Sequence, residues 1–149
     1  MKPTPKELAI RAIGRTTDAV FRDADRVPRK RWEEPAAPGA GSLRTVLTHL
    51  IFCEDWWLIS ISIPEGERPP VPDLAKIRSA KKMLDVLRAA REHLLEVLRG
   101  LPNTFFERPV PTCQYGDLKT GADLMLYAAE HDYYHVGQIN TLTMAFGKG

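Results

Sequence analysis

Two histidines lie four residues apart in the stretch AEHDYYHVGQIN, which spans residues 129–140. In an α-helix, side chains four residues apart share one face, so His131 and His135 can direct both imidazoles toward one point. Imidazole nitrogen is a common ligand of zinc, nickel and related ions. The pair alone is equally compatible with two polar side chains that the fold has accommodated, so other residues must decide between these interpretations.

The residues around the pair favour a binding site. Tyr127, Tyr134 and Gln138 fall within one turn of the histidines, where an ordinary bundle helix would present leucine or alanine. A buried polar stripe needs hydrogen-bond or metal partners. A metal held by protein alone generally needs at least three ligands, so the chain must supply a third.

The chain has two further histidines, and they differ in context. His93 lies off the leucine stripe of its helix and is expected at the surface. His49 lies in the apolar segment TVLTHLIFCEDWWL, where a lone histidine is usually a core residue bonded to backbone. Metal sites in bundles are built from side chains on facing helices, which favours His49 as the third ligand. Cys53 is expected to pack in the core, although a soft metal could recruit it or Cys113.

The elements that must position these residues are helices. TPKE and Thr120 with Asp123 have the form of capping boxes, and Ser42 is suited to cap another helix. Segments rich in proline and glycine separate the apolar periodic stretches, and residues 103–119 are expected to form a structured loop. Adjacent Trp56 and Trp57 cannot face the same way, so one should pack inside and the other should line an interface or pocket. Helices are expected from Thr4 to about Asp25, from Ser42 to a point before Pro64, from about Ser79 to Arg99, and from Thr120 to about Ala145, which predicts an all-α, antiparallel four-helix bundle.

Composition limits the number of domains, the partners and the location that we expect. The 149 residues suggest one domain, residues 1–149. The net charge of +2, from 21 basic and 19 acidic residues, does not argue for nucleic acid as a partner. The longest apolar run, around WWLISISI, is too short to span a membrane. Two cysteines without a disulfide or CxxC pattern favour a reducing, cytoplasmic location.

Three segments carry a resemblance to a known family. HLIFCEDWWL, the lead-in YGDLKTGADLMLYAAE and the final HDYYHVGQI are similar, in this order, to motifs of the DinB-like proteins, which are related to the YfiT-type metal-dependent hydrolases. The resemblance covers nearly the whole chain. It implies an up-down-down-up four-helix bundle, often a homodimer, that binds a divalent metal, commonly nickel or zinc, through His49, His131 and His135. Val136 departs from the arginine that many members carry there, which puts any role of that arginine in doubt but not metal binding.

The resemblance also implies chemistry on a small molecule. Relatives include hydrolases, transferases that use the low-molecular-weight thiol bacillithiol, and an isomerase that uses mycothiol, so a metal-dependent hydrolase or thiol S-transferase is expected. Glu54, Asp55, Asp132 and Tyr134 are candidates for proton transfer or for orienting a ligand imidazole, and the catalytic base is not identified. The alternative is a non-catalytic metal-binding or structural stress-response bundle.

HDYYH also differs from the zinc-protease pattern HExxH only at Asp132. The shorter aspartate and the lack of a downstream ligand argue against a protease.

Overall fold

Four long helices form the fold in the computed structural model, which describes residues 1–110 and 120–147. They are α1 (Pro5–Asp25), α2 (Leu43–Ser60), α3 (Ala80–Gly100) and α5 (Gly121–Phe146). A short helix α4 (Asn103–Glu107) and the 3₁₀ turns η1 (Arg29–Arg31), η2 (Glu65–Glu67) and η3 (Leu74–Lys76) lie in the connections. No strand occurs in these described ranges, which confirms the all-α class.

The helices begin where the sequence predicts, because side chains satisfy their first free N–H groups. Thr4 and Glu7 form a reciprocal capping box at α1, and Thr120 and Asp123 form another at α5. The Ser42 side chain accepts a hydrogen bond from the backbone N–H of Thr45 at the start of α2. Each predicted start therefore agrees with the structure to within one residue.

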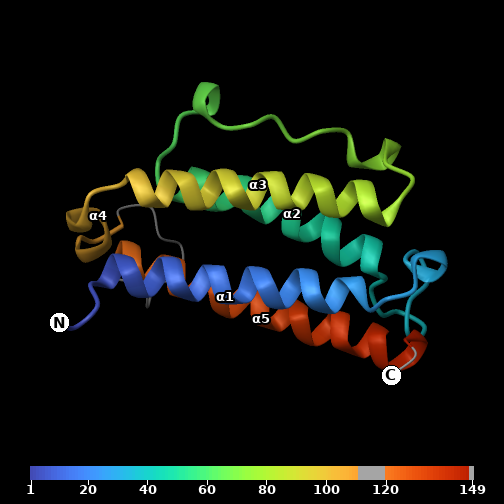
Figure 1. The fold of residues 1–149 in the computed structure, drawn as a ribbon. Coiled ribbons are helices and arrows are strands. Elements are labelled where there is room, and N and C mark those ends of the chain that lie inside the picture. The colour runs from blue at the N-terminus through green and yellow to red at the C-terminus, as the bar shows by residue number, and fades with distance from the viewer. Residues whose placement is uncertain (111–119, 148–149) are drawn as a thin grey trace.

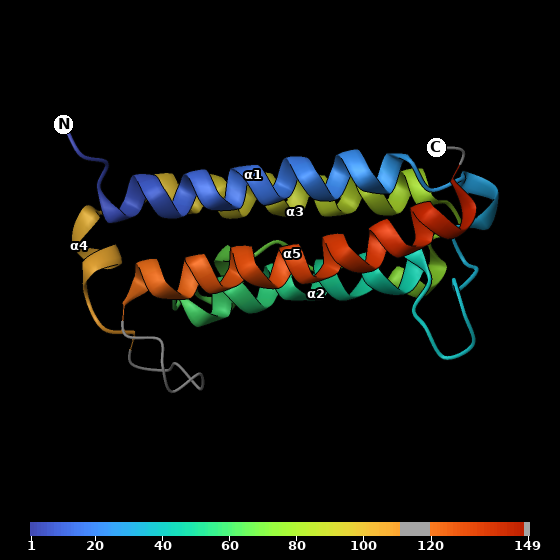
Figure 2. The same ribbon diagram turned by 90° about the horizontal axis from the view of Figure 1, so that it is seen from below.

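The helix directions follow the up-down-down-up order implied by the family resemblance. In Figure 1, α1 and α5 run from left to right, whereas α2 and α3 both run from right to left. Two successive helices can be parallel only if the chain returns along the whole bundle, and residues 61–79 make this return as a long arch. Seen from below, α1 and α5 lie side by side in front, with α3 behind α1 and α2 behind α5 (Figure 2).

The core consists of two apolar clusters separated by a polar layer. One cluster combines the C-terminal halves of α1 and α5 with the N-terminal halves of α2 and α3, and the other combines the opposite halves. Between them each long helix contributes a buried polar residue: Thr16, Glu54, Arg91 and Asp132. His49 and Cys53 of α2 and His131 and His135 of α5 lie at the same level. The candidate site therefore belongs to this layer.

Two expectations for the connections and surface can be compared with the structure. The predicted structured loop contains helix α4, which starts after Pro102, so a loop over all of residues 103–119 is wrong at its beginning. Residues 111–119, including Cys113, lie outside the described residues. Trp57 is 2% exposed and Trp56 is 37% exposed, which confirms that the two rings face opposite ways.

None of the helices in the described ranges combines the length and apolar character that a membrane span requires.

Candidate metal centre

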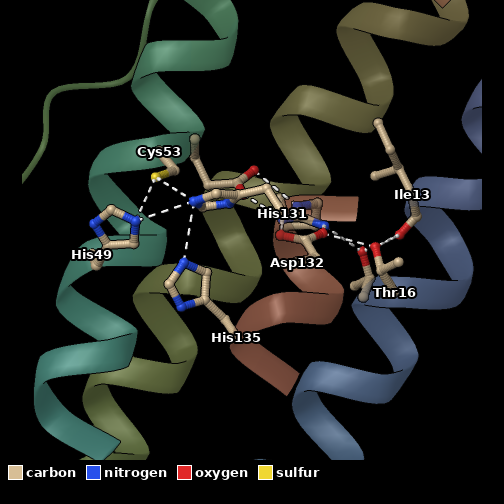
Figure 3. A network of polar contacts seen from close by, with 10 residues as sticks. Ile13, Thr16, His49, Cys53, His131, Asp132 and His135 are labelled. Carbon is tan, nitrogen blue, oxygen red and sulfur yellow. Dashed lines mark hydrogen bonds and ion pairs between the residues drawn. The ribbon is translucent and has the colours of Figure 1, made fainter. Parts of the chain in front are cut away.

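The structure brings the three predicted histidines together. Nε2 of His131 lies 3.2 Å from Nε2 of His49 and 3.1 Å from Nε2 of His135. His49 comes from α2 and the other two come from successive turns of α5, as Figure 3 shows. His49 is exposed, His131 is half-buried and His135 is buried, so the cluster extends from the surface into the bundle. Metal ligation by these three residues stays a prediction, but the geometry it requires is present.

Gln138 fixes the orientation of His135. The side-chain oxygen of Gln138 lies 2.6 Å from Nδ1 of His135, and this oxygen can only accept a hydrogen bond. The proton of the neutral ring is therefore on Nδ1, and the lone pair on Nε2 faces His131. Ligand histidines in proteins are commonly oriented by such a bond from the other ring nitrogen.

The protonation states also suit metal binding. Burial, together with repulsion from His135 and His49, lowers the pKa of His131 to about 4. Burial lowers the pKa of His135 as well, although its bond to Gln138 opposes the shift. Both rings are neutral near pH 7, which is the form that coordinates a metal.

The two separations that His131 Nε2 makes with the other ring nitrogens are those of ligands around one ion. With metal–nitrogen bonds of about 2.0–2.1 Å, two nitrogens of a tetrahedral site lie about 3.3 Å apart. The two separations measured from His131 Nε2, 3.1 and 3.2 Å, are close to this value. Nε2 of His135 carries a lone pair, and a proton on Nε2 of His131 could be directed at only one of its two neighbours, whereas one cation would accept a lone pair from each ring. The residues present therefore fit a divalent metal.

Cys53 is half-buried and packs against the apolar core, as expected, and its sulfur also belongs to the histidine cluster. Its sulfur lies 3.4 Å from Nε2 of His49 and 3.9 Å from Nε2 of His131. The donor atoms of His49, Cys53 and His131 all lie within 4.8 Å of one another, so these three residues also form a possible metal site. Burial, with repulsion from Glu54 and Asp132, raises the pKa of the Cys53 thiol to about 12, so without a cation it stays protonated.

The two nearest carboxylates are engaged elsewhere. Arg91 of α3 donates paired hydrogen bonds to Glu54 and to Asp132, and Thr16 donates to Asp132 at 2.7 Å. Arg91 also donates to the hydroxyl of Thr17 at 2.8 Å. In Figure 3 the Asp132 carboxylate is directed toward Thr16 of α1 and away from His49. Both acidic residues therefore form a buried ion network instead of facing the histidines.

The other two candidates for proton transfer, Asp55 and Tyr134, are also poorly placed to act as a base. The Asp55 carboxylate accepts a hydrogen bond from Arg68 at 2.8 Å. Tyr134 is 66% exposed and packs its ring edge-on against His135. Tyr127 packs edge-on against Trp57, which itself contacts His131 edge-on. The aromatic residues thus surround the histidine rings without supplying an evident base.

His93 is half-buried and takes no part in the histidine cluster. It lines a separate cavity of about 410 Å³ between α2, α3 and the connector at residues 69–72. Arg91 was the important residue of α3 that sequence reasoning missed. A signal was available, because Arg91 interrupts the stripe of Leu84, Leu87, Leu94 and Leu98 at a position where leucine would be expected.

Comparison with known proteins identifies the family. The family model described as the DinB superfamily matches residues 11–139, which include all three histidines, Cys53 and Arg91. No curated protein and no solved structure shows significant similarity to the chain. Since the match covers most of the sequence, the chain belongs to the DinB superfamily.

Proposed function

We propose that this protein binds one divalent metal ion through Nε2 of His49, His131 and His135 and uses it in chemistry on a small molecule. The observation that carries the proposal is the convergence of three Nε2 atoms, with separations of 3.1 and 3.2 Å from the central ring. Exposed His49 places one side of the cluster at the surface, where an ion and a substrate can approach. Nickel and zinc both suit imidazole ligands.

Neutral histidines contribute no negative charge, so the bound ion would keep its full positive charge. Such an ion acts as a Lewis acid and lowers the pKa of a water or thiol that binds beside it. The protein's own residues hold the site in position. Gln138 holds the His135 ring, and Arg91 fixes α2 and α5 relative to each other through Glu54 and Asp132.

Thiol transfer is a better candidate than hydrolysis. Where the bound ion does not ionise the attacking water fully, a hydrolase also needs a general base within hydrogen-bond reach of that water. Glu54 and Asp132 are bonded to Arg91, and Asp55 is bonded to Arg68. An external low-molecular-weight thiol would need no protein base if the bound ion lowered its pKa enough for the proton to pass to solvent. The position of Asp132 also argues against the zinc-protease alternative, in which this residue would have to act on water.

A non-catalytic metal-binding role is the second candidate, and Cys53 favours it. Its sulfur lies within the cluster and offers a protein ligand where an enzyme would keep an open position.

One assay separates the two roles. Untagged, metal-loaded protein is incubated with a low-molecular-weight thiol and a panel of alkyl electrophiles, and loss of the free thiol is measured. The enzymatic proposal expects turnover that disappears in His49→Ala but not in His93→Ala. Absence of turnover across the panel, with metal still bound, would support binding without catalysis.

A further inference from the structure

The cluster contains a potential fourth ligand that is sulfur, not nitrogen. We infer that the Cys53 thiolate completes the metal centre, so that the ion is held by three imidazole nitrogens and one sulfur. This inference rests on the proposed metal binding by His49, His131 and His135, and it specifies the coordination of that same site.

The distances support a common centre. For metal–sulfur bonds of about 2.3 Å and metal–nitrogen bonds of about 2.0–2.1 Å, sulfur and nitrogen ligands of a tetrahedral site lie about 3.6 Å apart. Cys53 Sγ lies 3.4 Å from His49 Nε2 and 3.9 Å from His131 Nε2. Together with the two nitrogen–nitrogen separations of 3.2 and 3.1 Å, four of the six edges of a tetrahedron are within a few tenths of an ångström of ideal values.

The helices present their ligands in matching pairs. His49 and Cys53 are four residues apart on α2, and His131 and His135 are four residues apart on α5. Each pair therefore shares one face of its helix, and the two faces meet (Figure 3). Glu54 follows Cys53 and Asp132 follows His131, and both are bonded to Arg91. The ion network thus holds the two ligand pairs at the same level.

Sulfur changes what the centre can hold and do. A thiolate favours zinc and other borderline or soft ions over magnesium, calcium and manganese, which prefer oxygen. Four protein ligands fill a tetrahedral coordination sphere, as in structural zinc sites. A substrate thiol would then have to replace Cys53 instead of entering an open position. Cys53 therefore controls whether external thiols reach the ion.

The test uses Co²⁺ as a spectroscopic probe of ligand type. Untagged Cys113→Ser protein, in which Cys53 is the only thiol, is titrated with Co²⁺ and compared with Cys53→Ser/Cys113→Ser and with His49→Ala/Cys113→Ser. We expect one Co²⁺ per chain, intense visible bands of a tetrahedral ion, and a sulfur-to-cobalt charge-transfer band in the near ultraviolet. The Cys53→Ser change should abolish the charge-transfer band while binding persists. Circular dichroism confirms that the variants keep their helical content.

A second measurement counts the protons that metal binding releases. Binding of Zn²⁺ to the Cys113→Ser protein at pH 7 should release about one proton more than binding to Cys53→Ser/Cys113→Ser, because the Cys53 thiol must lose its proton to coordinate the ion. If Co²⁺ binds through His49 without a charge-transfer band, and Zn²⁺ releases equal numbers of protons from the two proteins, the inference about Cys53 is wrong while the three-histidine proposal stands. If no Co²⁺ binds, or His49→Ala binds it equally well, both are wrong.

Discussion

Polar groups lie on both sides of the contact between α2 and α5, and their partners differ. On the inner side, Glu54 and Asp132 are both bonded to the guanidinium of Arg91, which is only 4% exposed. On the outer side, the preceding residues of the two helices, Cys53 and His131, lie in a cluster whose donor atoms converge. Glu54 directly follows Cys53, and Asp132 directly follows His131. The two carboxylates bond to Arg91, whereas the sulfur and the imidazole face the candidate metal site.

The difference shows which polar residues serve the fold and which serve binding. Two carboxylates and one guanidinium carry a formal charge of −1, and their hydrogen bonds link α1, α2, α3 and α5. In the second group, the Cys53 thiol and the imidazoles of His131 and His135 are neutral near pH 7, and their donor atoms face the same point as His49. The first arrangement stabilises the fold through ion pairs, whereas the second would gain its stability from a bound cation.

Loss of Arg91 should produce the largest effect. Arg91→Met leaves Glu54 and Asp132 buried without their common partner, which should lower the free energy of unfolding by about 3–5 kcal/mol. Urea denaturation measures the change. The matched control is Arg29→Met, which removes an exposed pair with Asp25 and should cost no more than about 1 kcal/mol. Equal losses in the two variants would show that the network does not support the fold.

Removal of His131 should weaken metal binding and leave the fold intact. His131→Ala deletes the central ligand and should weaken Zn²⁺ affinity by more than the 10–100-fold that is typical for outer-shell changes. The metal-free protein should keep its helical content, because the ring forms no part of the Arg91 network. Isothermal titration with Zn²⁺ measures the affinity, and His93→Ala is the histidine control. Similar Zn²⁺ affinities in the two variants would place the metal elsewhere.

A smaller effect is expected at Gln138. Gln138→Leu removes the acceptor that holds His135 Nδ1–H, so Zn²⁺ affinity should fall about 10–100-fold. Gln138→Glu retains an acceptor and should recover most of the loss. Competition with a chromogenic chelator gives both values. An unchanged affinity in Gln138→Leu would mean that packing alone orients His135.

The smallest effect concerns pH. His131 has a pKa of about 4 in the folded protein, compared with about 6.5 for an exposed histidine. Between these values the unfolded chain binds more protons, so His131 makes unfolding of the metal-free protein easier as the pH falls from about 7 to about 4. His131→Gln should reduce this dependence, as measured by urea denaturation across the range. An identical pH dependence in both proteins would contradict a depressed pKa.

The sequence was sufficient for the helices because their signals are local. Thr4, Ser42, Ser79 and Thr120 act as caps in the structure, and proline-rich connectors separate the helices as expected. The apolar stripes also identified which faces are buried. Helix α4 was missed because five residues are too few for a periodic pattern.

The candidate site was only partly accessible from sequence. His131 and His135 share a local spacing, whereas their approach to His49 was inferred from the architecture of helix bundles and from the family resemblance. Contacts among Glu54, Arg91 and Asp132 join three helices, so no local spacing could reveal them. Cys53 was anticipated only in part for a similar reason: it packs against the core as its apolar neighbours suggested, but the orientation of α2 also directs its sulfur toward His49.

Metal content tests the central claim most directly. Untagged protein, His49→Ala and His93→Ala are purified in parallel without added chelator and examined by elemental analysis. A divalent-metal centre predicts about one zinc or nickel per chain in the unaltered protein and in His93→Ala, with loss of most of it in His49→Ala. Negligible metal in all three proteins, also after incubation with Zn²⁺ or Ni²⁺, would contradict it.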